Sequence, residues 1–193
     1  MNYSSAKAFI ISELNKLPPS LTYHGKHHTL DVLNVAESLC IAENMSNHET
    51  ILILTAALFH DSGFLEHYDN HEMYSCEMAR KVLPAFDYTE GVVERICALI
   101  MATKIPQTPH DHCAEILCDA DLDYLGRADF YAIGQSLFLE MKNRNLVKTE
   151  KEWNKIQIRF LESHHFFTKT SGNTRTQAKQ EYLETLKKSS AKK

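Results

Sequence analysis

An apolar run that ends in two polar residues constrains this chain more than any other feature. Residues 51–59 read Ile-Leu-Ile-Leu-Thr-Ala-Ala-Leu-Phe, and His60 and Asp61 follow at once. A helix that is apolar on nearly every side is buried, so this one carries an imidazole and a carboxylate into the interior. Isolated buried charge is strongly disfavoured. Either a divalent cation compensates both groups, or the pair caps the helix and bonds to backbone, and the run alone leaves both interpretations open.

The rest of the chain shows helical periodicity and almost no strand-like alternation. Its 193 residues suffice for one domain with a substantial core and are too few for two large domains. We therefore expect an all-α, single-domain helical bundle of about eight or nine helices, with residues 189–193 as a frayed tail. The expected helices cover residues 3–17, 29–44, 46–59, 71–83, 89–103, 111–125, 129–143, 149–164 and 174–187.

Composition and charge narrow the classes of function. The formal net charge is -4, so nothing favours nucleic acid or an anionic membrane surface as a partner. No segment has the length of a membrane span and the N-terminus lacks the pattern of a signal peptide, which favours the cytoplasm. The 5 cysteines are scattered without a Cys-x-x-Cys pair, so we expect neither a disulfide framework nor a zinc ribbon. Assembly into a homo-oligomer stays open.

Two further polar residues fall on apolar helix faces. His28 lies four residues before Val32 and extends an apolar stripe at a helix start. Asp121 shares a helix face with Leu117 and Leu125. A histidine at a helix end is often structural, and a salt bridge to a neighbouring helix would also explain an inward Asp. Each residue taken alone therefore leaves the choice open.

Together with His60 and Asp61, these residues supply two imidazoles and two carboxylates, all expected to point inward from three helices. Such a ligand set suits Mn²⁺, Fe²⁺, Co²⁺ or Zn²⁺ and needs no thiolate. Four coincidences of this kind are hard to explain by packing. We therefore favour a divalent metal ion bound by His28, His60, Asp61 and Asp121.

The order His, His-Asp, Asp resembles the HD superfamily of metal-dependent phosphohydrolases, all-α enzymes that act on phosphomonoesters and phosphodiesters. Residues 23–28 are similar to the family's opening stretch, in the Tyr-His-x-x-x-His form also seen in cyclic-nucleotide phosphodiesterases. Residues 58–63 match the central His-Asp pair, and residues 119–123 match the last ligand region. The resemblance implies an HD-type core over 23–126, with 127–188 packing on it or covering it as a lid.

By the same resemblance, the metal ligands are the four residues already named. Members of the family with two metals carry further histidines after the His-Asp pair, and His71 can match the first of these. At the later position, residues 101–104 read Met-Ala-Thr-Lys. One ion per chain (Mn, Fe, Co, Zn or Mg) is therefore favoured, and a second stays open.

Hydrolysis at such a centre needs groups that orient water and neutralise phosphate charge. Asp61 is the catalytic candidate for orienting the water or taking its proton, because it is a ligand with a second oxygen. Lys104 and His71 are further catalytic candidates, although a Lys at a helix end more often extends into water and His71 can cap a helix. The expected substrate contacts are His24, Lys104, His164 and Arg175.

Three functions compete. The leading hypothesis is an enzyme that hydrolyses a phosphoester of a nucleotide or a related small molecule by metal-activated water. A cyclic-nucleotide phosphodiesterase is the close alternative, and it would open a cyclic diester without releasing phosphate. A non-catalytic nucleotide-sensing module is the third, although an intact ligand set argues against it. No Gly-x-x-x-x-Gly-Lys loop occurs, which argues against triphosphate hydrolysis by that route.

Overall fold

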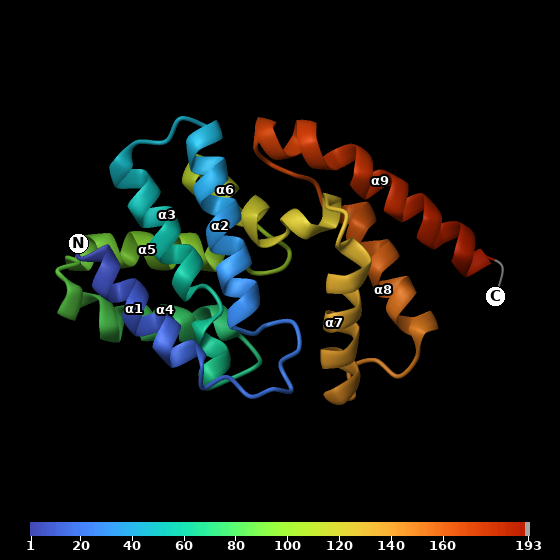
Figure 1. The fold of residues 1–193 in the computed structure, drawn as a ribbon, viewed down its shortest axis with the longest axis horizontal. Coiled ribbons are helices and arrows are strands. Elements are labelled where there is room, and N and C mark those ends of the chain that lie inside the picture. The colour runs from blue at the N-terminus through green and yellow to red at the C-terminus, as the bar shows by residue number, and fades with distance from the viewer. Residues whose placement is uncertain (192–193) are drawn as a thin grey trace.

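The computed structural model describes residues 1–191. Within them it consists of nine α-helices and three short 3-10 helices with no strand, which confirms the all-α prediction (Figure 1). The elements are α1 (Tyr3–Leu14), α2 (Lys26–Ala42), α3 (Asn47–Phe59), η1 (Ser62–Leu65), α4 (His71–Val82), η2 (Leu83–Phe86), α5 (Glu90–Ala102), α6 (His112–Asp121), η3 (Asp123–Gly126), α7 (Phe130–Asn143), α8 (Glu150–Ser163) and α9 (Lys169–Ala191).

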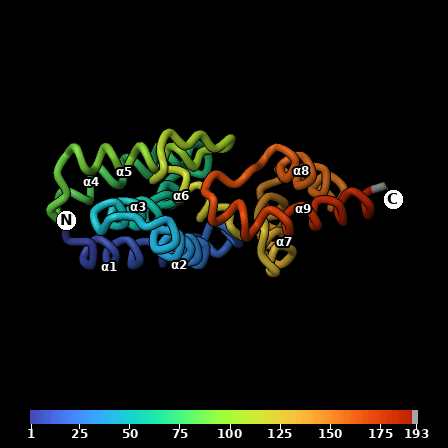
Figure 2. Tube along the Cα trace, turned by 90° about the horizontal axis from the view of Figure 1, so that it is seen from above, coloured from blue at the N-terminus to red at the C-terminus, as the bar shows by residue number. Residues whose placement is uncertain are grey.

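The apolar helix predicted from the sequence is the centre of the main core. Ser46 and Glu49 form a capping box at the start of α3, which satisfies its first free backbone N–H groups. Every residue from Leu52 to Phe59 is buried, because α2, α5 and α6 pack around α3. Figures 1 and 2 show α1 to α6 gathered on one side of an elongated molecule. The core therefore lies directly beneath the His-Asp pair.

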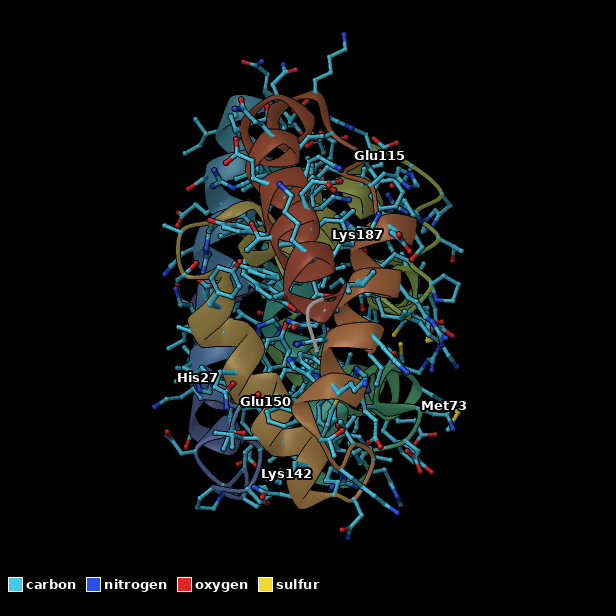
Figure 3. All side chains as sticks on the ribbon, turned by 90° about the vertical axis from the view of Figure 1, so that its right-hand side faces the viewer. His27, Met73, Glu115, Lys142, Glu150 and Lys187 are labelled. Carbon is cyan, nitrogen blue, oxygen red and sulfur yellow. The ribbon has the colours of Figure 1, made fainter. Side chains whose placement is uncertain are left out.

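Helices α7, α8 and α9 form the other end of the molecule (Figure 2). Their apolar faces meet in a second cluster that includes Phe130, Leu161 and Leu183, and this cluster also takes in Tyr124 and Leu125 of η3. Figure 3 views this end from outside, with Lys142 of α7 and Lys187 of α9 on the outer surface. The apolar sides of the three helices thus face η3 and one another.

The structure corrects two predicted helices near the site. The helix expected over 111–125 ends at Asp121, and η3 follows after a break at Leu122. The helix expected from Thr174 already begins at Lys169, because the hydroxyl oxygen of Thr168 accepts a hydrogen bond from the backbone N–H of Ser171. Such a cap allows Gly172 and Asn173 to lie inside α9.

Smaller differences concern helix ends. The first helix stops at Leu14 and not at Leu17, since the prolines at 18 and 19 disfavour helical backbone before them. Helix α2 begins earlier than predicted, at Lys26, so His28 lies in its first turn. Residues 189–191 continue α9 where a frayed tail was expected, and residues 192–193 lie outside the described part. No helix found over residues 1–191 is both long and apolar enough to cross a membrane.

Candidate metal centre and adjoining cavity

Four polar residues that are far apart in the sequence meet at the end of α3. The Nε2 atom of His28 lies 3.1 Å from Oδ1 of Asp121 and 3.5 Å from Oδ2 of Asp61. The Nε2 atom of His60 lies 3.3 Å from Oδ2 of Asp61 and 3.6 Å from Oδ1 of Asp121. Two ligands bound about 2.1 Å from one ion, at right or tetrahedral angles, are themselves about 3.0–3.4 Å apart. The separations therefore suit one shared ion.

Two observations favour a cation over a self-contained hydrogen-bonded network. Nδ1 of His60 lies 2.8 Å from the carbonyl oxygen of Ala57, which can only accept, so Nδ1 carries the hydrogen and Nε2 offers a lone pair when the ring is neutral. Oδ2 of Asp61 is buried and has no hydrogen-bond partner within the described chain. Such a buried carboxylate oxygen, placed beside two imidazole nitrogens, would be stabilised by a cation bound between these atoms.

Without a cation, the cluster holds protons. Burial alone would lower the pKa of the His60 imidazole, but the carboxylates of Asp61 and Asp121 raise it well above its ordinary value of 6.5. Burial would raise the pKa of Asp61, yet the neighbouring imidazoles hold it well below 3.8. Because protons and a metal ion compete for the same atoms, metal affinity falls on acidification.

A tight turn brings His71 over Asp61. The turn after α3 packs so closely on the start of α4 that a Cβ atom at Gly63 would lie 2.0 Å from the backbone oxygen of His71, which only glycine avoids. Ser75 fixes this approach by donating to the carbonyl oxygen of His60 and accepting from the N–H of Gly63. As a result, Nε2 of His71 lies 3.4 Å from Oδ1 of Asp61.

His24 packs against the same aromatic ring as His71. The Phe64 ring stacks on His71 and on His24, with ring centroids 4.1 and 4.3 Å apart. Nδ1 of His24 is held 2.5 Å from Oε1 of Glu140, a fully buried residue of α7. The other oxygen of Glu140 accepts the backbone N–H groups of Tyr23 and His24. Glu140 therefore orients His24 and fixes the loop before α2.

Sequence analysis did not select Glu140, although a signal for it exists. Glu140 lies three residues after Leu137 and seven after Ile133, so helical spacing places it on an apolar face of α7. Burial would raise its pKa, but the hydrogen bond and charge of His24 lower it overall. The lowered pKa indicates that Glu140 is buried as a charged carboxylate, with hydrogen bonds to both of its oxygens.

The cluster opens into a cavity of about 310 Å³. Asp61, Asp121, His24 and His71 line one end of it. The opposite wall is formed mainly by apolar side chains of η3, α7 and α8, and includes Trp153. The volume is at the lower end of the range for small-molecule pockets, about 300–1,000 Å³.

Three of the expected contact residues do not line this cavity. Lys104 is exposed at the rim, where its Nζ atom lies 3.3 Å from Oδ1 of Asn70 at the start of α4. Arg175 forms a bidentate ion pair with Asp123, with Nε to Oδ1 at 2.7 Å and Nη2 to Oδ2 at 3.2 Å. This pair ties α9 to η3 and engages the Nε–Nη2 edge of the guanidinium, and Arg175 is not among the residues that line the cavity.

His164 lines a smaller pocket of about 160 Å³, which shares Leu122 and Phe160 with the central cavity. Gln107 lies in the same pocket, with its Nε2 atom 3.4 Å from Oδ2 of Asp121. Gln107 therefore contacts Asp121 from the side of the smaller pocket. No sequence signal marks Gln107, because an amide in a proline-containing loop belongs to no periodic pattern.

We expect the substitution His164→Asn to reduce the loss of stability on acidification. Burial, together with the nearby Lys179 amine, lowers the pKa of His164 to about 3, whereas unfolding restores a value near 6.5. Below pH 6.5 the unfolded state therefore binds a proton that the folded state excludes until about pH 3, and the free energy of unfolding falls across this window.

Urea unfolding at pH 7 and pH 5 tests this expectation. Over that interval the wild type should lose about 1–2 kcal/mol more than His164→Asn. The matched control is His48→Asn, which changes an exposed histidine of α3 and should behave like the wild type. Equal losses in all three proteins would show that His164 is not kept neutral by the fold.

Comparison with known proteins finds a similar sequence and a similar fold. A protein of Clostridium beijerinckii, described as uncharacterized, is 33% identical over 101 residues. The match covers 51% of this chain and 62% of that protein, which is less than two thirds of its length. The crystal structure of Bacillus subtilis YpgQ in complex with ADP has the same fold, with a TM-score of 0.66 over 98% of this chain and 97% of that chain, at 19% identity.

The family comparison is more specific. The HD domain matches residues 26–123 of the sequence. HD domains bind divalent metal ions, and His28, His60 and Asp121 offer ligand atoms that all lie within 4.8 Å of one another. Because the match spans half of the sequence and contains the whole cluster, the chain belongs to the HD superfamily of metal-dependent phosphohydrolases.

Proposed function

We propose that this protein is an enzyme that hydrolyses a phosphoester of a nucleotide or a related small molecule with the help of a bound divalent ion. The observation that carries the proposal is the convergence of two imidazoles and two carboxylates at one end of a cavity that is large enough for a small ligand. The fold likeness to YpgQ, a protein whose structure contains ADP, supports a nucleotide-like ligand.

The residues that would hold the ion are His28, His60, Asp61 and Asp121. Their nitrogen and oxygen donors suit Mn²⁺, Fe²⁺, Co²⁺ or Zn²⁺, and a carboxylate-rich set also accepts Mg²⁺. When bound, such an ion acidifies a coordinated water and neutralises charge on the phosphate. One ion per chain is the simplest occupancy, because the ligand atoms that lie within 4.8 Å of one another belong to His28, His60 and Asp121, and His71 contacts this group through Asp61.

The chain's own residues would position water and phosphate. Asp61 turns Oδ1 toward His71 and Oδ2 toward the cluster, so one carboxylate can both bind and accept a proton from water. His71 keeps that carboxylate in place. Lys104 lies at the rim, from where its amine can add positive charge near an entering phosphate.

His24 is the best-placed proton donor of the cavity. Glu140 accepts the hydrogen on Nδ1, which leaves Nε2 as the atom that can exchange a proton with a ligand. The side chain is 18% exposed, so it contacts the cavity without facing bulk water. We assign His24 the delivery of a proton to the oxygen that leaves phosphorus.

Phosphate release separates the three candidate functions. The protein, loaded in turn with Mn²⁺, Co²⁺, Fe²⁺, Zn²⁺ and Mg²⁺, is incubated with phosphomonoesters and with cyclic nucleotides. A monoesterase releases inorganic phosphate from the monoesters, and this is the result we expect. A cyclic-nucleotide phosphodiesterase instead yields the monophosphate without inorganic phosphate. Nucleotide binding without turnover under any metal would favour the sensing module and contradict the proposal.

Metal removal is expected to lower the melting temperature. At an ion concentration about 100 times its Kd, binding to the folded state alone stabilises a protein by about 2.7 kcal/mol. For a chain of this size, 1 kcal/mol corresponds to about 2–4 °C, so EDTA should lower Tm by about 5–10 °C and Mn²⁺ should restore it. The variant Asp61→Asn should show no response to either addition, and a response equal to that of the wild type would place the ion elsewhere.

A further inference from the structure

The central cavity is chemically divided, which restricts the ligand that it can take. At one end, Asp61, Asp121 and Glu72 bring carboxylates together, with His24 and His71 beside them. The remaining wall is almost entirely hydrocarbon. Its larger members, contributed by η3, α7 and α8, are Leu125, Phe130, Leu137, Met141, Trp153 and Ile156.

No Lys or Arg lines this cavity in the part of the chain that the structure describes. Cations on the surrounding elements are engaged elsewhere: the Arg144 guanidinium lies 3.4 Å above the Tyr68 ring, and Arg175 is held in its ion pair. The Lys179 amine donates to the carbonyl oxygen of Leu161. The labelled lysines of Figure 3 lie on the outer surface of α7 and α9. Positive charge is therefore available only at the rim and, with an ion bound, at the cluster.

The polar end of the cavity and its apolar wall favour different parts of a ligand. A phosphate group at the cluster meets the ion and the histidines. A second phosphate group placed against the apolar wall would lose its hydration and find no cation there, with only scattered donors such as the Gln157 amide and the Trp153 indole N–H, which is strongly disfavoured. An aryl or alkyl group placed there would gain from burial, because apolar surface is removed from water on both sides.

We propose that the substrate is a phosphate monoester whose organic group is mainly apolar, with one phosphate at the cluster and the organic group against α7 and α8. This proposal rests on the proposed function, and among the phosphoesters considered there it favours esters of small apolar alcohols over nucleotides. Hydrolysis adds water across the phosphorus–oxygen ester bond, so the products are inorganic phosphate and the apolar alcohol. The hydroxyl group of the water becomes bonded to phosphorus. The proton that the water loses is balanced by the proton that the alcohol oxygen receives as it leaves.

Binding can be measured without turnover, because the single tryptophan of the sequence, Trp153, lines the apolar wall. The Mn²⁺-loaded protein is titrated with n-hexylphosphonate and with the α,β-methylene analogue of ADP, and Trp153 fluorescence is followed. We expect the phosphonate to bind with a Kd at least about tenfold lower. A lower or equal Kd for the ADP analogue, or no response to the phosphonate, would overturn the proposal.

Hydrolysis distinguishes the substrate class from the function itself. The panel is 1-naphthyl phosphate, n-hexyl phosphate, AMP and ADP, with inorganic phosphate as the common product. The two apolar esters should have the highest kcat/KM, and their ratio tells a flat group from a chain. Comparable or faster hydrolysis of ADP overturns this inference and leaves the phosphohydrolase intact. No release from any compound under any metal removes the proposed function, while the fluorescence titration still tests the binding preference.

Two isoleucines provide a matched pair of variants. Ile156 lines the cavity and is 40% exposed, whereas Ile41 is 75% exposed at the end of α2 and lies outside it. Ile156→Ala should lower kcat/KM for 1-naphthyl phosphate by about three- to tenfold, and Ile41→Ala should leave it unchanged. Ile156→Lys should raise the ratio of ADP to naphthyl phosphate hydrolysis by at least about threefold. An unchanged ratio would show that the wall does not select the organic group.

Discussion

Asp61→Asn is expected to abolish stoichiometric metal binding and to reduce phosphoester hydrolysis by more than about 100-fold. Loss of a residue that merely supports a metal ligand typically costs 10–100-fold, and Asp61 offers a donor directly. Its Oδ2 atom lies 3.3 and 3.5 Å from the two imidazole Nε2 atoms and has no hydrogen-bond partner of its own. Elemental analysis of dialysed protein measures the first effect, and initial rates with Mn²⁺ measure the second.

The control is Asp69→Asn, which changes an exposed carboxylate in the loop that follows η1. It should keep both the metal and the activity. Asparagine has the shape of aspartate, so Asp61→Asn should remain folded by circular dichroism. If neither wild type nor variant retains metal after incubation with Mn²⁺ or Fe²⁺, the four residues form a buried polar network and the enzyme proposal falls with the site.

Helical periodicity could predict this cluster because each of its members continues an apolar stripe. His28 precedes Val32 by one turn, Asp121 follows Leu117 by one turn, and both end up against the end of α3. The HD resemblance then supplied the order in which three separate helices meet. Neither argument needs long-range geometry, since the residues are marked by local burial alone.

The parts that sequence reasoning missed depend on contacts between distant segments. Glu140 is marked as inward by its spacing, but its partner is the backbone of residues 23–24, more than one hundred residues earlier. Arg175 carries the right chemistry for phosphate, yet its Nε and Nη2 atoms donate to Asp123, and no local pattern reveals that pairing. The apolar wall likewise exists only because α7 and α8 fold back over η3.

Glu140→Ala is expected to lower the free energy of unfolding by about 3–5 kcal/mol, because each buried donor left without an acceptor costs about 1–3 kcal/mol. The change leaves three donors without an acceptor: the N–H groups of Tyr23 and His24 and the imidazole Nδ1 of His24. Glu140→Gln should cost less, because its amide oxygen can still accept both backbone N–H groups. Urea unfolding at pH 7 measures both variants, with Glu77→Ala on the exposed side of α4 as the control.

The pH dependence shows whether the charge of Glu140, and not only its shape, stabilises the fold. Although burial opposes it, the contact with His24 lowers the pKa of Glu140 below its ordinary 4.5. A carboxyl group with a lowered folded-state pKa contributes stability that is present above pH 4.5 and is lost as the pH falls through the folded-state value. The stability difference between wild type and Glu140→Gln should therefore be largest near neutral pH and shrink below pH 4.5. A difference that stays constant with pH would mean that Glu140 acts as a neutral acceptor, and the role of His24 as a carboxylate-held proton donor would have to be abandoned.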